Sequence, residues 1–296
     1  MTVDPNNDIR DALWAFIEKN ISFRESSQGL GHYTRLSSAL EILKSGTLWA
    51  RDTSTFPKCH GEDHRIALTL EALSWSRQHG PTASRPLRNG LRSEFLDPTL
   101  AVRAFAACLS TDTDSPHMWR EFGDSGHGCC IVVDPRFVNP DVQIFAIPCI
   151  YDLETQKEVL TGLLECADTL AAGLLQETRA QRLLIDATAC LILAGQAYKV
   201  SSLVAERECR YVYLEYQGQS HNRLAEPTLG NDPGSQRVIP IVGTNTLSPF
   251  VAVRLGPSAS TEKNVRGLMD HLASIGLSDL SVETSSCRAV PENQSR

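Results

Sequence analysis

The fold class is first indicated by residues 29–52, which read GLGHYTRLSSALEILKSGTLWARD. The GHYT segment predicts a short strand, and residues 37–44 predict a helix because leucines recur at helical spacing along one side. Gly46 predicts a left-handed cap at the end of that helix, since glycine adopts positive φ without steric cost. TLWA then predicts a second strand, so this stretch indicates an α+β pattern.

The same mixture continues along the chain, so we expect an α+β fold in a single domain spanning residues 1–296, with its core at about residues 29–290. Helices are predicted at residues 7–19, 63–78 and 261–275, and leucine spacing in residues 154–197 predicts an inserted helical hairpin. Residues 79–90 are predicted to form a loop because they are rich in Gly, Pro and Ser. Strands are predicted for FAACLS (105–110), GHGCCIVVD (126–134), ECRYVYLEY (208–216), RVIPIVG (237–243), FVAVRLG (250–256) and LSVETS (280–285).

Composition limits the functional classes. With 296 residues, 42% of them hydrophobic, the chain can bury a large core, which excludes disorder of the whole chain. The net charge of -7 gives no global electrostatic footprint for nucleic acid or for an anionic membrane surface. The N-terminus lacks the regions of a signal peptide, and no stretch has the roughly 18–20 uninterrupted apolar residues of a membrane helix. We therefore expect a cytoplasmic protein with no membrane partner.

Cysteine and histidine usage indicates neither a disulfide framework nor a metal centre. The nine cysteines are odd in number and scattered, as expected for free thiols. One segment, CHGEDH, brings metal-type ligands together in Cys59, His60 and His64. Because no CxxC pair completes a tetrahedral set, we expect no metal cofactor.

Two carboxylates lie close together in VAERECRYVYLEY, residues 204–216. Glu206 and Glu208 are two apart where a strand is predicted to begin, so side-chain alternation places both on one face of the sheet. Two adjacent carboxylates repel each other unless a cation, a proton or a ligand intervenes. Arg207 and Arg210 could neutralise them as a surface network, which is the structural alternative to a reactive site.

Two further positions have both a structural and a functional interpretation. His32 directly precedes the helix at residues 37–44, and it is either a partly buried histidine with satisfied hydrogen bonds or a ligand-binding group. Trp119 follows the polar loop after Ser110, and it either anchors that loop by packing or contacts a ligand.

Four segments occur in an order that resembles a large bacterial domain family of unknown function. They span roughly residues 29–290 and read HYTRLSSALEILKSGTLWARD, AACLSTDTDSPHMWREFGDSGHGCCIVVD, AYKVSSLVAERECRYVYLEY and FVAVRLGPSASTEKNVRGLMDHL. Members typically show His-Tyr-Thr, a Met-Trp-x-x-Tyr segment before a Gly-x-Cys-Ile strand, Tyr-Glu-x-Glu-Trp-Arg and a late Leu-Gly-Pro strand. This chain has Phe122 and Cys209 at two of those aromatic positions, and FPKCHGEDH replaces a Leu-Asn-Asp-x-x-Glu segment. It therefore resembles a divergent member.

That family is in turn similar to the ADP-ribosyltransferase-like fold, which implies a mixed or antiparallel β core with flanking helices and NAD as the substrate. The resemblance matches His32 to the first motif of such enzymes, Ser110 to the second and Glu208 to the third, with Glu206 as the alternative reactive carboxylate. Breaking the nicotinamide–ribose bond develops oxocarbenium character on the sugar, which a carboxylate stabilises. His32 is implied to hydrogen-bond the ribose or amide region and fix its orientation.

Other positions are implied to bind the rest of the dinucleotide. Tyr33 and Thr34 complete the first motif, and Tyr33 or Trp119 is implied to stack on nicotinamide. Arg120 or Arg210 is implied to meet the pyrophosphate as a bidentate donor. No Gly-x-Gly-x-x-Gly fingerprint is present, so a Rossmann-type site is not expected.

The expected function is therefore that of an NAD-using, ADP-ribosyltransferase-like enzyme, which acts as a transferase on an unknown acceptor or as a glycohydrolase. Two alternatives belong to other classes. One is a sensor that binds a nucleotide or NAD derivative without turnover, and the other is a nucleic-acid-targeting effector in phage defence or a toxin system. The effector would need a basic face, which the negative net charge does not indicate.

Overall fold

The computed structural model describes residues 7–21, 29–56, 62–79, 85–96, 102–137, 141–172, 177–216, 224–225, 236–242 and 248–288. The helices are α1 (Asn7–Asn20), α2 (Leu36–Ser45), α3 (Glu62–His79), α4 (Arg85–Leu96), α5 (Pro116–Glu121), α6 (Leu153–Ala172), α7 (Glu177–Gly195) and α8 (Glu262–Ser274). The strands are β1 (Leu30–Thr34), β2 (Thr47–Asp52), β3 (Val102–Ser110), β4 (Cys129–Val133), β5 (Ile144–Pro148), β6 (Glu208–Tyr216), β7 (Gln236–Pro240), β8 (Phe250–Leu255) and β9 (Ser281–Thr284).

The α+β class is confirmed, and the predicted helices and strands are present with ends that shift by a few residues. Gly46 ends α2 in the left-handed region, with φ 66° and ψ 25°, and its N–H donates to the Ile42 carbonyl. The predicted helical hairpin consists of α6 and α7, which pack against each other and against α1. The sequence pattern did not predict α5 or β5.

The loop predicted at residues 79–90 is wrong at residue 79, which ends α3, and from residue 85 onward, where α4 begins, while residues 80–84 lie outside the described residues. Pro86 lies in the first helical turn, where its missing N–H breaks no helical hydrogen bond. Tertiary contacts then favour the helix. Leu91 is buried, and the Arg88 guanidinium is paired with the Asp168 carboxylate on α6, with Nε 3.0 Å from Oδ1. The Pro and Gly content alone did not indicate these long-range partners.

One mixed sheet contains the described strands. Its order is β5-β6-β3-β1-β4-β8-β9, and β2 joins by pairing with β3 and β7. The described ladders are antiparallel except the one between β8 and β9. Two strands share one edge of β3: Phe105 and Ala106 pair with β2, whereas Ser110 pairs with Gly31 of β1. The sheet therefore forks along residues 107–109 of β3.

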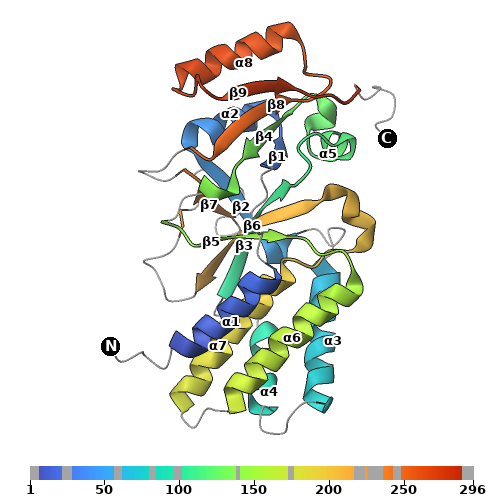
Figure 1. Ribbon diagram of the computed structural model, residues 1–296, viewed down its shortest axis with the longest axis vertical. Coiled ribbons are helices and arrows are strands. Elements are labelled where there is room, and N and C mark those ends of the chain that lie inside the picture. Colours follow the sequence, from blue (N-terminus) through green and yellow to red (C-terminus); the bar gives the residue numbers. More distant parts are fainter. Residues whose placement is uncertain are drawn as a thin grey trace.

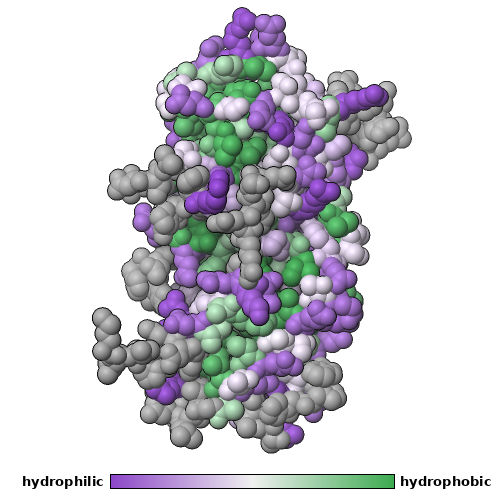
Figure 2. Space-filling model, in the orientation of Figure 1, coloured by the Kyte–Doolittle hydropathy of each residue, from purple (hydrophilic) through white to green (hydrophobic). Residues whose placement is uncertain are grey.

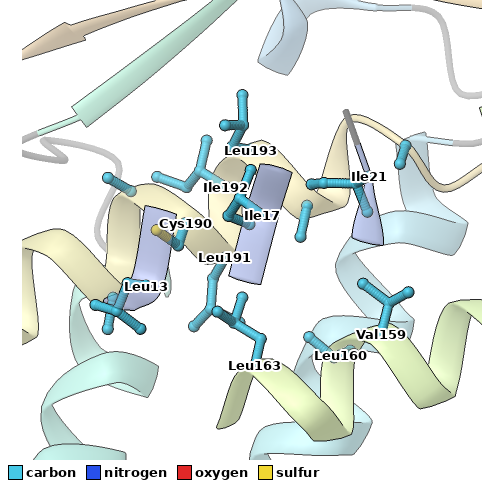
Figure 3. Close-up of a cluster of buried hydrophobic side chains, with 14 of the residues drawn as sticks. Leu13, Ile17, Ile21, Val159, Leu160, Leu163, Cys190, Leu191, Ile192 and Leu193 are labelled. Carbon is cyan, nitrogen blue, oxygen red and sulfur yellow. The ribbon is translucent and has the colours of Figure 1, made fainter. Parts of the chain in front are cut away.

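The sheet lies between two groups of helices, with α1, α3, α4, α6 and α7 at one end of the molecule and α2 and α8 at the other (Figure 1). Alternate residues of β3 and β6 pack against the first group, which we call the helical bundle. The side chains of α1, α6 and α7 converge in the centre of this bundle (Figure 3). The buried strand residues in this cluster are Val102, Ala104 and Ala106 of β3, Ile147 of β5, and Val212 and Leu214 of β6.

The opposite face of β3 packs toward α2 and α8 through Phe105, Ala107 and Leu109. A third, smaller cluster lies beneath α5 and contains Tyr33 and Trp119. Among the helices that the structure describes, none combines the length and apolarity of a membrane-spanning segment. On the face shown in Figure 2, hydrophilic residues are interspersed with hydrophobic ones from one end to the other.

Candidate functional site

A cavity of about 310 Å³ lies at the fork of the sheet. Cys108 of β3 pairs with Arg210 of β6, and Ser110 pairs with Glu208, so these four side chains share the face that carries the helical bundle. Where β3 and β6 extend past the helical bundle, the side chains on this face change from apolar to polar. This polar part of the face forms one wall of the cavity. The lining used below comprises His32, Tyr33, Trp49, Arg51, Phe56, Cys108, Phe122, Lys199, Glu206, Glu208 and Arg210.

Two cations and two carboxylates form a buried cluster in this wall. The Lys199 ammonium donates to both Glu206 and Glu208, and Arg210 Nε donates to Glu208 Oε1 at 2.9 Å. All four residues are almost completely buried, with exposed fractions of 2% for Lys199, 6% for Glu206, 5% for Glu208 and 3% for Arg210. Because unpaired buried charges are strongly disfavoured, the equal number of positive and negative groups is what makes this cluster tolerable.

Ion pairing keeps these groups charged. Burial raises the pKa of Glu208, but Arg210 and Lys199 outweigh that effect and hold the pKa well below its ordinary value. Burial likewise lowers the pKa of Lys199, but Glu208 and Glu206 outweigh it and raise the pKa above its ordinary value. Glu208 is therefore a carboxylate and Lys199 an ammonium at neutral pH.

A left-handed turn, and not strand alternation, brings the two carboxylates together. Glu206 ends a 3-10 turn, and β6 begins only at Glu208, so the prediction that both lie on one strand is wrong. Between them Arg207 adopts φ 44° and ψ 45°, and its exposed guanidinium lies 4.0 Å from the Asp112 carboxylate. Of the two arginines predicted to neutralise the carboxylates, Arg210 does so by pairing with Glu208, but the network is buried and not on the surface, and Lys199 takes the place of Arg207.

The two carboxylates differ in how many of their oxygens are occupied. Glu208 accepts from Arg210 at Oε1, and from both Lys199 and Arg210 at Oε2. Glu206 accepts from Lys199 at Oε2, and no donor from the described part of the chain reaches its Oε1. Glu206 Oε1 is therefore the carboxylate oxygen that is available to a ligand.

The chain that follows α7 holds Lys199 and Arg210 in place. Gln156 of α6 donates to the Lys199 carbonyl at 2.8 Å, and Arg210 Nη1 donates to the Gln196 carbonyl at 3.1 Å. The Arg210 guanidinium also lies over the Phe56 ring, 5.6 Å from its centroid. Lys199 is thus fixed by the helical bundle, while Arg210 of β6 is fixed by the chain that follows α7.

His32 lines the cavity at the fork. Its Nδ1 lies 3.0 Å from the Cys108 carbonyl oxygen, and because a carbonyl only accepts, Nδ1 carries the proton. Burial lowers the pKa of His32, so the ring is neutral at pH 7 and Nε2 is an acceptor. Within the described ranges no donor contacts Nε2. The ring is therefore anchored through one nitrogen and presents the other to a ligand.

Tyr33 and Trp119 act mainly as packing residues. The Tyr33 hydroxyl donates to the Asp112 carbonyl at 2.8 Å and accepts from the Ser115 N–H at 2.9 Å. The Tyr33 ring lines the cavity and meets the Trp119 ring edge-on, with centroids 4.7 Å apart. Trp119 is fully buried, and its indole N–H donates to Asp114 Oδ1 at 2.8 Å. It packs beneath α5 and does not line this cavity.

Three other predicted positions lie beside the cavity but are not part of its lining. The buried Ser110 hydroxyl donates to the Glu206 carbonyl at 2.8 Å and accepts from the Asp112 N–H at 3.1 Å, so it fixes the turn that carries Glu206. Thr34 is paired with β4. Arg120 is exposed on α5, where Nε donates to the neighbouring Glu121 carboxylate at 2.7 Å.

The sequence interpretation missed several lining residues. Lys199 is the only charged residue in LILAGQAYKV, residues 191–200, and this isolation in an apolar run was a usable signal. Trp49 and Arg51 alternate with buried Leu48 and Ala50, a strand pattern that leaves one face of β2 exposed. Phe56 had no such signal, because its position depends on the fold around Arg210.

The structure places no metal-type ligand set in the described ranges. No group of three or more His, Cys, Asp or Glu side chains is positioned there to hold a metal ion. His64 Nε2 instead lies 2.8 Å from Gln156 Oε1, and Cys59 and His60 lie outside the described residues.

Comparison of the chain with protein-family models, with curated proteins and with solved structures finds no match in any of the three. Its function must therefore be inferred from the cavity.

Proposed function

We propose that the cavity binds the nicotinamide–ribose part of NAD and that the protein, an ADP-ribosyltransferase-like enzyme, breaks the bond between the two. The observation that supports this is the convergence of His32 with Glu206, Glu208 and Arg210 on one cavity from two parts of the chain more than 170 residues apart. A volume of about 310 Å³ is at the lower end of the range for ligand pockets, which suits half of a dinucleotide.

The proposed reaction breaks the bond from ribose C1′ to the nicotinamide nitrogen. The bonding electrons leave with nicotinamide, and the sugar gains oxocarbenium character. The oxygen of water or of an acceptor hydroxyl then forms the new bond to C1′ and releases its proton to solvent water. Glu206 is the catalytic residue of this proposal, because its Oε1 is open to the cavity and can stabilise the developing positive charge. Glu208 is a positioning residue, since its oxygens are occupied by Arg210 and by Lys199, the cation that also holds Glu206.

His32 and the aromatic residues would bind the substrate before the reaction. His32 Nε2 is an acceptor and suits a ribose hydroxyl or an amide N–H. Trp49 and Phe56 line the cavity and offer ring faces to nicotinamide. The family resemblance implies this stacking role for Tyr33 or Trp119 instead. Trp119 is buried and does not line the cavity, so this proposal assigns the stacking role to Trp49 and Phe56.

The test is titration calorimetry with NAD and with ADP-ribose, combined with chromatographic detection of released nicotinamide. Wild-type protein should bind NAD and release nicotinamide, and His32→Ala should weaken binding, whereas His271→Ala on α8 should not. Because protonation converts His32 Nε2 from an acceptor to a donor, affinity should fall at pH values below 6.5, the ordinary pKa that burial lowers further. A folded wild-type protein that neither binds NAD nor releases nicotinamide would refute the proposal.

A second candidate is a sensor that binds NAD or ADP-ribose without turnover. The observation that favours it is the pairing of both carboxylates with Lys199 and Arg210, since a charge-balanced cluster stabilises a cationic transition state less than a free pair of carboxylates. The same two measurements separate the candidates, because a sensor gives binding heat and no nicotinamide.

A further inference from the structure

The charges of the side chains that line the cavity do not sum to zero. Lys199 and Arg210 balance Glu206 and Glu208, while His32 lines the cavity as a neutral ring because burial lowers its pKa. Arg51 is the remaining charged residue of the lining. The lining therefore carries one net positive charge, and it is located at Arg51.

The position of Arg51 is set by the register of β2. Arg51 pairs with Ala106 of β3, which faces the helical bundle beside the cavity, so the Arg51 side chain lies on the cavity face. Its neighbour Asp52 alternates to the opposite face and accepts from Arg103 Nε at 3.1 Å. Arg51 is exposed, and none of the described carboxylates forms an ion pair with it. Its guanidinium is therefore open to an anionic group of a ligand.

An aromatic side chain accompanies this charge. Trp49 lies two residues before Arg51 on the same face of β2, about 7 Å away along the strand. Its side chain is 53% exposed although it lines the cavity. An exposed ring beside a guanidinium without a counterion suits a ligand in which a flat heterocycle is joined to a phosphate.

We propose that Arg51 forms a phosphate subsite at the mouth of the cavity, so that the protein selects nucleotides over the corresponding nucleosides. This inference rests on the proposed function, because it assigns the group that would bind the phosphate next to the nicotinamide ribose. The proposal assigns phosphate binding to Arg51 and not to Arg120 or Arg210. Arg120 does not line the cavity, and Arg210 is already paired with Glu208.

The experiment compares two probes that differ by one phosphate, nicotinamide mononucleotide and nicotinamide riboside, by titration calorimetry. We expect the wild-type protein to bind the mononucleotide about tenfold more tightly than the riboside. Arg51→Gln should raise the Kd of the mononucleotide about tenfold and leave that of the riboside unchanged, while Arg51→Lys should lie between the two. Arg92→Gln, which removes an exposed arginine on α4, is the matched control and should bind both probes as the wild type does.

Each other outcome has a definite meaning. If Arg51→Gln raises the Kd of both probes by the same factor, or changes neither Kd, then Arg51 does not bind the phosphate. The proposed function then stands without this subsite. If the wild-type protein binds neither probe and does not bind NAD, the proposed function fails and the subsite fails with it. Raising the salt concentration should weaken mononucleotide binding more than riboside binding, because only the mononucleotide would form the exposed ion pair.

Discussion

At the scale of single residues, Glu206 and Glu208 should respond differently to loss of charge. Glu208→Gln removes the charge that pairs with both Lys199 and Arg210 and leaves Arg210 without an ionised partner in the cluster, so we expect it to lower the free energy of unfolding by about 3–5 kcal/mol. Glu206→Gln leaves Lys199 and Arg210 both paired with Glu208, so it should lower the free energy of unfolding by about 1 kcal/mol, yet reduce nicotinamide release roughly 100-fold or more. Urea unfolding and a nicotinamide assay measure the two effects. Equal losses of stability would contradict the unequal roles assigned to these residues.

The pH dependence of stability provides a second measurement on the same variant. The pKa of Glu208 is depressed in the folded protein, so its ion pairs contribute stability that is fully present above pH 4.5, its ordinary value, and is lost as the pH falls toward the depressed pKa. Glu208→Gln removes this titration. The variant should therefore lose less stability than the wild type when the pH is lowered from about 5 to 3.

How much of the site the sequence could predict depends on how local each contact is. His32 and the Glu206–Glu208 pair were recognisable because motif order and spacing are properties of the chain itself. The structural role of Ser110 was not, because its hydroxyl bonds to a carbonyl 96 residues away. Lys199 was missed although its two acidic partners lie only 7 and 9 residues away, because the turn that brings them together has an arginine and not a glycine as its left-handed residue.

At the scale of elements, prediction succeeded where local chemistry determines the backbone. The end of α2 follows from Gly46, whose positive φ needs no tertiary support. The start of α4 does not follow from local sequence, because a Pro and a Gly weaken the helical signal and a buried ion pair to α6 compensates for it. The fork in the sheet depends on two strands that share one edge of β3, and nothing in either strand alone predicts that.

The turn before β6 gives a prediction at this scale. Arg207 holds a left-handed conformation that costs roughly 1–2 kcal/mol for a residue with a Cβ. Arg207→Gly removes that strain and adds about 0.4–1 kcal/mol of unfolded-state entropy, so its stability should lie within about 1 kcal/mol of the wild type. Arg207→Val should be about 1–2 kcal/mol less stable than the glycine variant, because a β-branched residue tolerates this region poorly. If urea unfolding shows that the glycine and valine variants lose the same stability, then the contact of Arg207 with Asp112 determines stability at this position, and the backbone conformation does not.

At the scale of the whole molecule, the helical bundle and three strands of the sheet, β3, β5 and β6, share one core. Leu160 of α6 is completely buried in the cluster that also contains Ala104 of β3 and Val212 of β6. We expect Leu160→Ala to cost about 2–5 kcal/mol. Hydrogen exchange should show amides of β3 and β6 losing protection together with those of α6. Met269→Ala on α8, where the side chain is 55% exposed, is the control and should change stability by less than about 0.5 kcal/mol.

One face of β3 and β6 packs against the helical bundle along part of its length and lines the cavity along the rest. This arrangement restricts which insertions and deletions the two strands can accept. In β6, Glu208 and Arg210 face the cavity, and Val212 and Leu214 continue the same face into the bundle. Deleting a single residue after Arg210 would turn the two halves of that row to opposite faces. The charged pair and the apolar anchor would then no longer share a side of the sheet. Lineages of this protein should therefore place insertions and deletions outside β6, and length variation inside the strand should coincide with loss of both the charged cluster and the bundle.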